Sequence, residues 1–180
     1  MMNVSTKNDV DDNPFGNNTE DVTDPEATGT AAYGGLYRWC GTSTPPNDMR
    51  GNTSASDDHD TGSSYSSTND TAKKIWGDNW RMPTQAEFQA LIDNCTWSTF
   101  SAGYTITGKD GYSSNSIFLP AAGCFYYNGN AVFSVGTSGY YWSSTPNGSY
   151  AYFLFFSSSY LGKPYDYRKS GYSVRAVLVE

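Results

Sequence analysis

The sequence is poor in cysteine, basic residues and histidine, and each scarcity excludes a class of function. Among its 180 residues it has three cysteines, Cys40, Cys95 and Cys124, none of them in a Cys-x-x-Cys spacing. A disulfide framework and a structural zinc site are therefore both poorly supported. We expect three buried free thiols, because unpaired cysteines usually lie in protein cores.

Positive charge and long apolar runs are also scarce. Lys and Arg number 11 against 18 Asp and Glu, which gives a formal net charge of −7. A nucleic-acid-binding protein needs a basic stripe to release counterions, so we expect no nucleic-acid partner. No run approaches the roughly 18 apolar residues of a membrane span, so we expect no direct membrane insertion. Residues 1–10 lack the basic and apolar segments of a secretory signal.

Few residues could form a conventional active site. The single histidine, His59, lies in a Ser-rich stretch, and the sequence has neither a Gly-x-Ser-x-Gly elbow nor a Gly-rich phosphate loop. After Asp110 the acidic residues thin out to Asp166 and Glu180. A pair of catalytic carboxylates stays open but has few candidates. We therefore expect no enzyme and no cofactor.

Two acidic stretches carry side chains that could bind a metal ion. Residues 9–20 carry oxygen donors at five positions of a calcium loop, but Pro14 occupies the sixth position, where such a loop needs glycine. Around His59, the acidic residues 57, 58 and 60 would need further ligands from elsewhere in the chain. We predict solvated acidic loops at both places and no metal site; calcium binding by residues 9–20 stays open.

The sequence is rich in aromatic residues, at 16%, which disordered chains are not. Its length suits one domain, so we predict a single domain over residues 1–180. Residues 7–69 show neither helical nor strand period and predict irregular coil. Within them, residues 33–39 should form a short strand that anchors the coil to the core. Residues 53–69 have almost nothing to bury and predict a mobile loop or an insertion.

Two helices are predicted before the strands begin. Asp70 can cap a short helix that ends at Gly77, and Thr84 with Glu87 forms a capping box for a helix over residues 85–94. Strands are expected at 140–143, 150–157 and 172–179, the last of them central because it is nearly all apolar. These elements predict an α+β fold with a small twisted antiparallel sheet, one or two helices and long irregular loops.

Residues 140–172 concentrate tyrosine, phenylalanine, serine and glycine. A sheet with one inner face cannot bury so many aromatic side chains. The same residue types dominate antibody paratopes, because tyrosine offers a large contact area at low entropic cost and serine and glycine adapt around it. We predict a ligand-binding surface here. The alternative is an aromatic-rich β core with a few exposed tyrosines.

Five motifs occur in an order that resembles a known family. They are GLYRW at 35–39, WGDNWRMPTQAE at 76–87, IFLPAAG at 117–123, YWSST at 141–145 and GYSVRAV at 171–177. Over about residues 33–178 the sequence resembles the Fibrobacter succinogenes major paralogue-type domains. The resemblance implies a C-type lectin-like fold, which formylglycine-generating sulfatase-modifying enzymes share. Related domains serve as variable proteins of diversity-generating retroelements in bacteria, phages and archaea.

The resemblance implies a receptor- or adhesin-type protein with residues 140–172 as its variable region. It would act at the cell surface or outside the cell, or alternatively on a virion tail. Its ligand would be a protein or another cell-surface molecule. The identity of the ligand and the oligomeric state stay open. Mutagenesis in such systems yields mainly Tyr, Ser, Phe, Asp, Asn and Gly. The resemblance implies a fixed frame at positions 142–144, 151, 154, 156, 168, 171 and 173–175, with residues of these types between them. Those that we expect to bind ligand are Tyr140, Phe153, Phe155, Ser157, Ser159, Tyr160, Tyr165, Asp166 and Tyr167.

Strand alternation adds that Phe153 and Phe155 should face one side and Leu154 and Phe156 the other, one pair in the core and one in solvent. The buried scaffold should include Trp80, Arg81, Trp142 and Arg175. The sequence has no Glu-Pro-Asn or Trp-Asn-Asp string, so calcium-dependent sugar binding is not implied. Its cysteines also lack the arrangement of the formylglycine generators. The alternatives are a surface structural domain without a diversified site and, third, an enzyme of the sulfatase-modifying fold.

Overall fold

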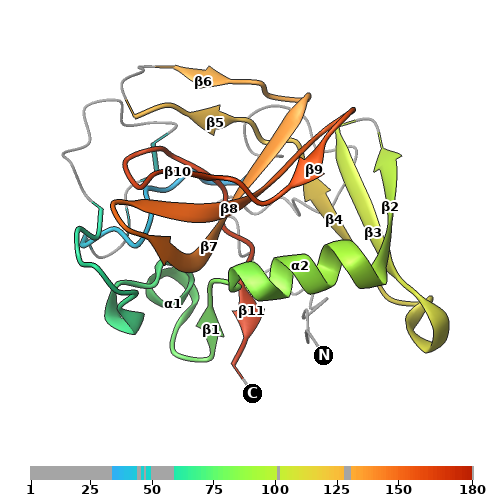
Figure 1. The fold of residues 1–180 in the computed structure, drawn as a ribbon, viewed down its shortest axis with the longest axis horizontal. Helices are drawn as coiled ribbons and strands as arrows, with labels where there is room; N and C mark the ends of the chain where they lie inside the picture. Colours follow the sequence, from blue (N-terminus) through green and yellow to red (C-terminus); the bar gives the residue numbers. More distant parts are fainter. Residues whose placement is uncertain are drawn as a thin grey trace.

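The computed structural model describes residues 34–43, 46, 48–49, 59–100, 102–127 and 131–179. These ranges form a mixed fold in which strands predominate, so the predicted α+β class is confirmed (Figure 1). The helices are η2 (Ser67–Asn69), α1 (Thr71–Trp76), α2 (Gln85–Asn94) and η3 (Asp110–Tyr112), where η marks a 3-10 helix. The strands are β1 (Trp80–Arg81), β2 (Cys95–Phe100), β3 (Gly103–Gly108), β4 (Ser116–Pro120), β5 (Cys124–Phe125), β6 (Val132–Phe133), β7 (Ser138–Asn147), β8 (Tyr150–Ser157), β9 (Leu161–Gly162), β10 (Tyr165–Tyr167) and β11 (Val177–Leu178).

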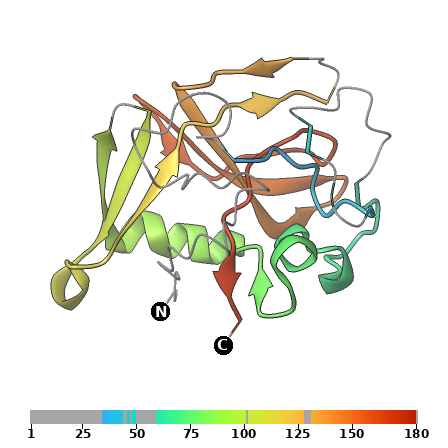
Figure 2. The same ribbon diagram turned by 180° about the vertical axis from the view of Figure 1, so that it is seen from behind.

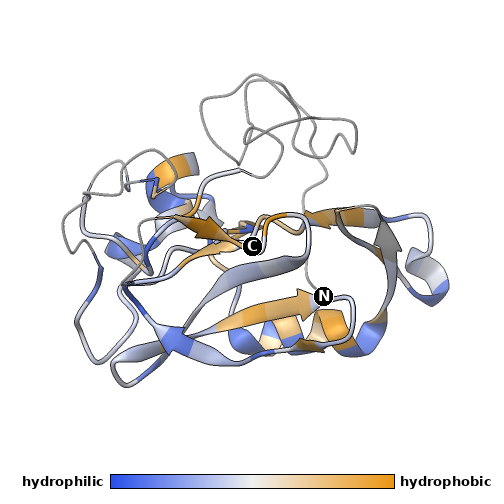
Figure 3. Cartoon of the chain, turned by 90° about the horizontal axis from the view of Figure 1, so that it is seen from above, coloured by the Kyte–Doolittle hydropathy of each residue, from blue (hydrophilic) through white to orange (hydrophobic). Residues whose placement is uncertain are grey.

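Both predicted helices are confirmed. The Asp70 carboxylate accepts a hydrogen bond from the Lys73 amide, and α1 ends at Gly77, whose φ of 92° lies in the left-handed region that favours glycine. The capping box of α2 is complete, since Thr84 and Glu87 each accept from the other's backbone amide. One side of α2 is hydrophobic and turns inward, while the other is hydrophilic (Figure 3).

The strands form several small antiparallel sheets. The central one has the order β10-β8-β7, with β9 pairing to β8, and a second has the order β2-β3-β4. The pairs β1-β11 and β5-β6 complete the arrangement. Viewed from either side, α2 runs along one edge of the molecule, between the β2-β3-β4 sheet at one end and α1 at the other (Figures 1 and 2).

The central sheet is buried on both faces over much of its length. On one face of β7 and β8, Trp142 and Phe153 pack in a cluster with Tyr172. On the other face, Leu154 and Phe156 pack in a cluster with side chains of α2. The core therefore lies on both sides of β7 and β8 at these residues, whereas Tyr150 and Tyr152 at the start of β8 are half-buried.

The segment 34–40 anchors the N-terminal part of the described chain to this core. Leu36 and Trp39 are fully buried, and the Trp39 indole Nε1 donates to the Ser143 carbonyl at 2.7 Å. In return, the Trp142 indole donates to the Tyr37 carbonyl at 2.8 Å. The anchor is confirmed, but its ladder pairing is limited to a bridge between Tyr37 and Tyr172, so the predicted strand is not formed.

The prediction of a central C-terminal strand over residues 172–179 is wrong. Only Val177 and Leu178 form a strand, and it pairs with β1 alone. Residues 171–173 instead bridge to three separate partners, Phe125, Tyr37 and Tyr141. The apolar run is buried because it passes through the core, and burial alone does not distinguish such a segment from a strand.

The remaining scaffold predictions have mixed outcomes. Trp142 and Arg175 are buried as expected, whereas Trp80 and Arg81 are half-buried. Residues 59–69 were expected to bury almost nothing, yet Asp60 is buried there. The acidic stretch 9–20 and the coil before residue 34 lie outside the described residues. Within the described ranges, no helix is long and apolar enough to cross a membrane.

Candidate functional site

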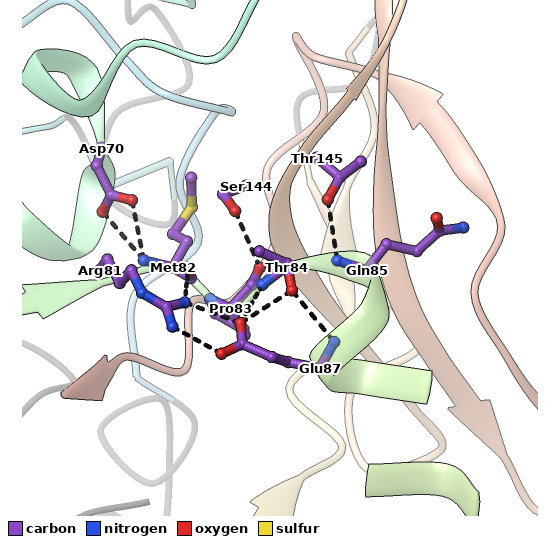
Figure 4. Close-up of polar contacts among 9 residues, drawn as sticks. All are labelled: Asp70, Arg81, Met82, Pro83, Thr84, Gln85, Glu87, Ser144 and Thr145. Atoms are coloured by element: carbon purple, nitrogen blue, oxygen red, sulfur yellow. Dashed lines mark hydrogen bonds and ion pairs between the residues drawn. The ribbon is translucent and has the colours of Figure 1, made fainter. Parts of the chain in front are cut away.

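A polar cluster lies between α1 and α2 (Figure 4). The fully buried Asp70 carboxylate accepts from the amides of Lys73 and Met82 and from the Tyr65 hydroxyl. The Lys73 amide lies at the N-terminus of α1, the Met82 amide lies at the start of the loop before α2, and the third donor is the Tyr65 side chain. The carboxylate is thus occupied in joining two helices, which makes it a structural group.

Arg81 and Glu87 form the second half of this cluster. Arg81 Nη1 and Nη2 donate to the two Glu87 carboxylate oxygens at 2.8 and 2.6 Å. Thr84 also donates its amide and hydroxyl to Glu87. The hydrogen bonds from Arg81 are the main reason that the pKa of Glu87 falls to about 2. A carboxylate held ionised in this way fixes the loop and is a poor proton donor near neutral pH.

Hydrogen bonds also join strand β7 to the loop before α2 and to the first residue of α2. Ser144 donates its amide to the Pro83 carbonyl at 2.8 Å, and the Gln85 amide donates to the Thr145 hydroxyl at 3.0 Å (Figure 4). The contacts of this cluster cap α1 and α2 and join the loop before α2 to Asp70 and to β7, which is a structural role.

The cysteines offer no reactive centre either. Cys40 and Cys124 are buried, Cys95 is half-buried, and all three are free. Burial raises the pKa of the Cys40 thiol and brings that of Cys124 to about 11, so both are protonated near neutral pH. Among the described residues, no group of three or more potential ligands could hold a metal ion.

Exposed aromatic side chains gather on a different part of the molecule. Of the nine exposed large hydrophobic side chains among the described residues, seven lie between residues 126 and 167. They come from the β5-β6 hairpin and from the β9 and β10 end of the central sheet, which are neighbours in Figure 1. Such a concentration exceeds the scattered exposed residues that need no explanation.

The centre of this region is a cluster of five tyrosines on two paired strands and one loop. We call it the tyrosine face, and it consists of Tyr127, Tyr150, Tyr152, Tyr165 and Tyr167. In the β8-β10 register, Tyr165 lies opposite Tyr152, and Tyr167 lies opposite Tyr150. Neighbouring rings touch, with centroid separations of 4.7 to 5.9 Å. Tyr165 is 56% exposed and Tyr167 is 42% exposed.

The tyrosine face exists because α2 covers only part of β8. Tyr150 and Tyr152 share a side of the strand with Leu154 and Phe156, because side chains alternate along a strand. At Leu154 and Phe156 that side is buried in the cluster containing α2, whereas at Tyr150 and Tyr152 it is half-buried. The same side of one strand therefore serves the core at one end and the surface at the other.

The tyrosine hydroxyls also interact with one another. A hydrogen bond with the Tyr167 hydroxyl is the main reason that the pKa of Tyr150 is raised. The one carboxylate in β10, Asp166, points to the opposite side, where it accepts from the hydroxyls of Tyr172 and Ser170. The tyrosine face thus offers neutral phenol groups without a carboxylate from its own strands.

The predicted ligand-binding residues fall into three groups. Tyr165 and Tyr167 lie on the tyrosine face. Phe155, Ser157, Ser159 and Tyr160 lie around the β8-β9 turn, with the Tyr160 ring on Phe155 at 5.7 Å. Tyr140 and Asp166 are half-buried on the inner side, Tyr140 with its ring against Phe155 and Tyr172.

The expectation that Phe153 is exposed is wrong. It is 6% exposed and packs between Trp142 and Tyr172. Alternation correctly separates Phe153 from Leu154, but the inner cluster covers one side of the strand and α2 covers the other. Phe155, on the same side as Phe153, lies nearer the strand end and stays half-buried.

Sequence reasoning missed Tyr127, Tyr150 and Tyr152. Tyr150 and Tyr152 lie in the predicted strand 150–157, but their partners lie in β10, which was not predicted as a strand, so the register that sets tyrosine opposite tyrosine had no signal in the sequence. Tyr127 precedes the Asn-Gly turn signal at residues 128–129, but no local signal indicates that this loop reaches β10.

Residues 109–177 match the model of a family described as "Domain of unknown function (DUF8237)". The matched range contains the whole tyrosine face as well as β4 to β10. No curated protein matches the chain, and no solved structure matches it.

Proposed function

We propose that this chain is a ligand-binding protein of the receptor or adhesin type, which presents the tyrosine face on a C-type lectin-like domain. The observation that carries the proposal is the clustering of five exposed or half-exposed tyrosines, four on the β8-β10 pair and Tyr127 on a neighbouring loop, beside a part of β8 that is buried in the core. The five motifs that resemble the Fibrobacter succinogenes major paralogue-type domains support the fold assignment.

The chemistry of the tyrosine face favours a protein ligand. Tyrosine supplies apolar contact area and a hydroxyl that can donate and accept, and its two side-chain torsions cost little entropy to fix. Binding energy in protein interfaces concentrates in a few such aromatic anchors. Because the Asp166 carboxylate is engaged on the inner side, the tyrosines would bind by packing and neutral hydrogen bonds.

The ligand surface would extend from the tyrosine face to the β8-β9 turn. The rings of Phe155 and Tyr160 contact each other there at an angle of 43°, beside the exposed Ser159. These side chains belong to the residue types that mutagenesis in diversity-generating retroelements produces. We infer that the face is diversified, and that the protein acts at a cell surface, outside the cell or on a virion. Sequencing the flanking DNA tests this inference, since a reverse-transcriptase gene and an imperfect repeat of the codons for 140–172 should lie nearby.

Binding itself can be tested with a combined variant in which Tyr150, Tyr152, Tyr165 and Tyr167 are all changed to serine. The labelled parent and variant are applied to a panel of bacterial cells and to an array of purified surface proteins. Tyr112→Ser is the matched control, because Tyr112 is 47% exposed in η3 and outside the tyrosine face. We expect the combined variant to lose binding while its Tm stays close to the parent's, and the control to bind normally.

Two outcomes would overturn the proposal. If the combined variant binds as the parent does, the site lies elsewhere. If neither protein binds any member of a broad panel, a surface structural domain without a ligand site becomes the better account. Turnover of a sulfatase-type peptide thiol by the parent would instead favour the enzyme alternative.

A further inference from the structure

Arg168 is an almost fully buried arginine that directly follows the tyrosine face in sequence. It is 2% exposed, and its guanidinium carbon lies 4.2 Å from the centre of the Trp39 ring. Burial is the main reason that the pKa of Arg168 is lowered. Bringing a guanidinium into a protein interior is costly unless its donors are satisfied, so its partners are informative.

The guanidinium donates four hydrogen bonds to main-chain carbonyls of two separate segments. Nε and Nη2 donate to Tyr150 and Gly148 at 3.1 and 2.7 Å. Nη1 donates to Asp60 and Gly62 at 2.9 and 2.6 Å. One segment is the turn into β8, and the other precedes η2, far away in the sequence. Arg168 itself continues the chain from β10.

The position of these contacts bears directly on the tyrosine face. Arg168 follows Tyr167 and holds the carbonyl of Tyr150, the residue whose ring lies 4.7 Å from the Tyr167 ring. The turn that it grips contains Gly148, whose φ of 58° places it in the left-handed region. We call the four hydrogen bonds of Arg168 the clamp. The clamp fixes the main chain at Tyr150 and next to Tyr167, and these two rings are the closest pair on the tyrosine face.

We propose that Arg168 is the positioning residue of the tyrosine face: it locks the start of β8, the end of β10 and the segment 60–62 together through their main chains. The proposal rests on the proposed function for its biological meaning. Because each contact is to a carbonyl oxygen, the clamp is indifferent to the side chains at 150 and 167. The face can then change its side chains while its backbone stays in place.

A comparison with Arg81 shows what is particular to Arg168. Arg81 also makes several hydrogen bonds, but two of them go to the Glu87 carboxylate, so that contact depends on a side chain. A lysine at 168 would keep the charge. Its single ammonium carries three donors on one nitrogen, so it could not reproduce the four hydrogen bonds that the three nitrogens of the planar guanidinium make to two segments.

The test compares Arg168→Lys with Arg81→Lys by NMR at neutral pH, and it needs no ligand. We expect Arg168→Lys to lose the ring-to-ring contacts between Tyr150 and Tyr167, seen as nuclear Overhauser effects, while signals of the β2-β3-β4 sheet stay unchanged. We expect Arg81→Lys to lower the Tm but to retain those contacts. Retention of the Tyr150–Tyr167 contacts in folded Arg168→Lys would overturn the proposal.

Hydrogen exchange of the parent protein decides the question if Arg168→Lys does not fold. The amides of Asp60 and Gly62 are hydrogen-bonded and can be followed beside those of β8 and β10. If Arg168 joins the segments, these amides become exposed in the same unfolding event. Their exchange rates should then increase with denaturant concentration to the same degree. Independent opening of 60–62 while β8 and β10 stay protected would overturn the proposal. Neither experiment depends on ligand binding, so failure here leaves the proposed function standing.

Discussion

Replacing Glu87 with glutamine tests the loop that carries the start of α2. The change keeps the side-chain size but removes the charge, and it turns one of the two acceptors of Arg81 and Thr84 into a donor. A fall in pKa from 4.5 to about 2 corresponds to roughly 3 kcal/mol of stabilisation. The Arg81 and Glu87 side chains are 34% and 24% exposed, so solvent screening reduces our expectation to about 1–2 kcal/mol.

The sign of the pH dependence follows from the lowered pKa. Because the folded state holds Glu87 ionised more strongly than the unfolded chain does, the stabilisation is complete above about pH 4.5 and disappears as the pH falls towards 2. We expect the free energies of unfolding of the parent and of Glu87→Gln, measured in urea, to differ by a constant amount of roughly 1–2 kcal/mol from pH 6 to 8. The curves should converge below about pH 4.

Asp93→Asn is the matched control for this measurement. Asp93 lies in the same helix and accepts a hydrogen bond from Gln89, but it is exposed. Its loss should change the stability by less than about 0.5 kcal/mol. If the difference in unfolding free energy between the parent and Glu87→Gln does not vary with pH, the electrostatic explanation is refuted. The loss would then come only from the disrupted geometry of the helix cap.

Three further results are expected from stability measurements. Trp142→Ala should cost roughly 3 to 5 kcal/mol, because the indole is fully buried and its loss also removes one of the two hydrogen bonds to the Tyr37 carbonyl, the other coming from the Tyr172 amide; an unchanged Tm would refute this. Phe153→Ala should cost a similar roughly 3 to 5 kcal/mol, whereas Tyr165→Ala should cost under about 1, and equal losses would contradict the division between core and face. Chelation with EDTA should leave the Tm unchanged, while a marked fall would point to calcium binding by residues 9–20.

The helices could be predicted because their signals are local. Asp70 and Gly77 mark the two ends of α1, and Thr84 with Glu87 marks the start of α2, each within a few residues of sequence. Strand β8 was also located from its own residues, with the bounds that the structure has. In each case, the side chains that determine the element lie inside it or next to it.

The errors come from contacts between distant segments. Whether Phe153 faces solvent depends on Tyr172 and Trp142, and alternation within β8 carries no information on what covers each side. The run after residue 172 is buried by partners in three parts of the chain, so its apolar character suggested a longer strand than exists. The two-residue strands β5 and β6 are too short to leave a period in the sequence.

The tyrosines of the tyrosine face that the sequence did not predict also depend on contacts between distant segments. Tyr165 and Tyr167 could be predicted from composition, but their partners Tyr150 and Tyr152 depend on the β8-β10 register. The side of β8 that they share is buried or open according to where α2 ends. Composition could thus indicate that a surface exists, but only the tertiary arrangement could say which tyrosines form it.

The central claim is that the tyrosine face binds ligand while the fold does not depend on its side chains. The most direct measurement displays a library in which positions 150, 152, 165 and 167 are randomised among Tyr, Ser, Phe, Asn and Asp. The folded fraction, read by protease resistance, is compared with that of a library randomised at the buried positions 141, 142, 153 and 172. We expect the first library to stay largely folded and to yield binders to an arbitrary protein target, and the second to unfold. Collapse of the first library, or a folded library without binders, would contradict the claim.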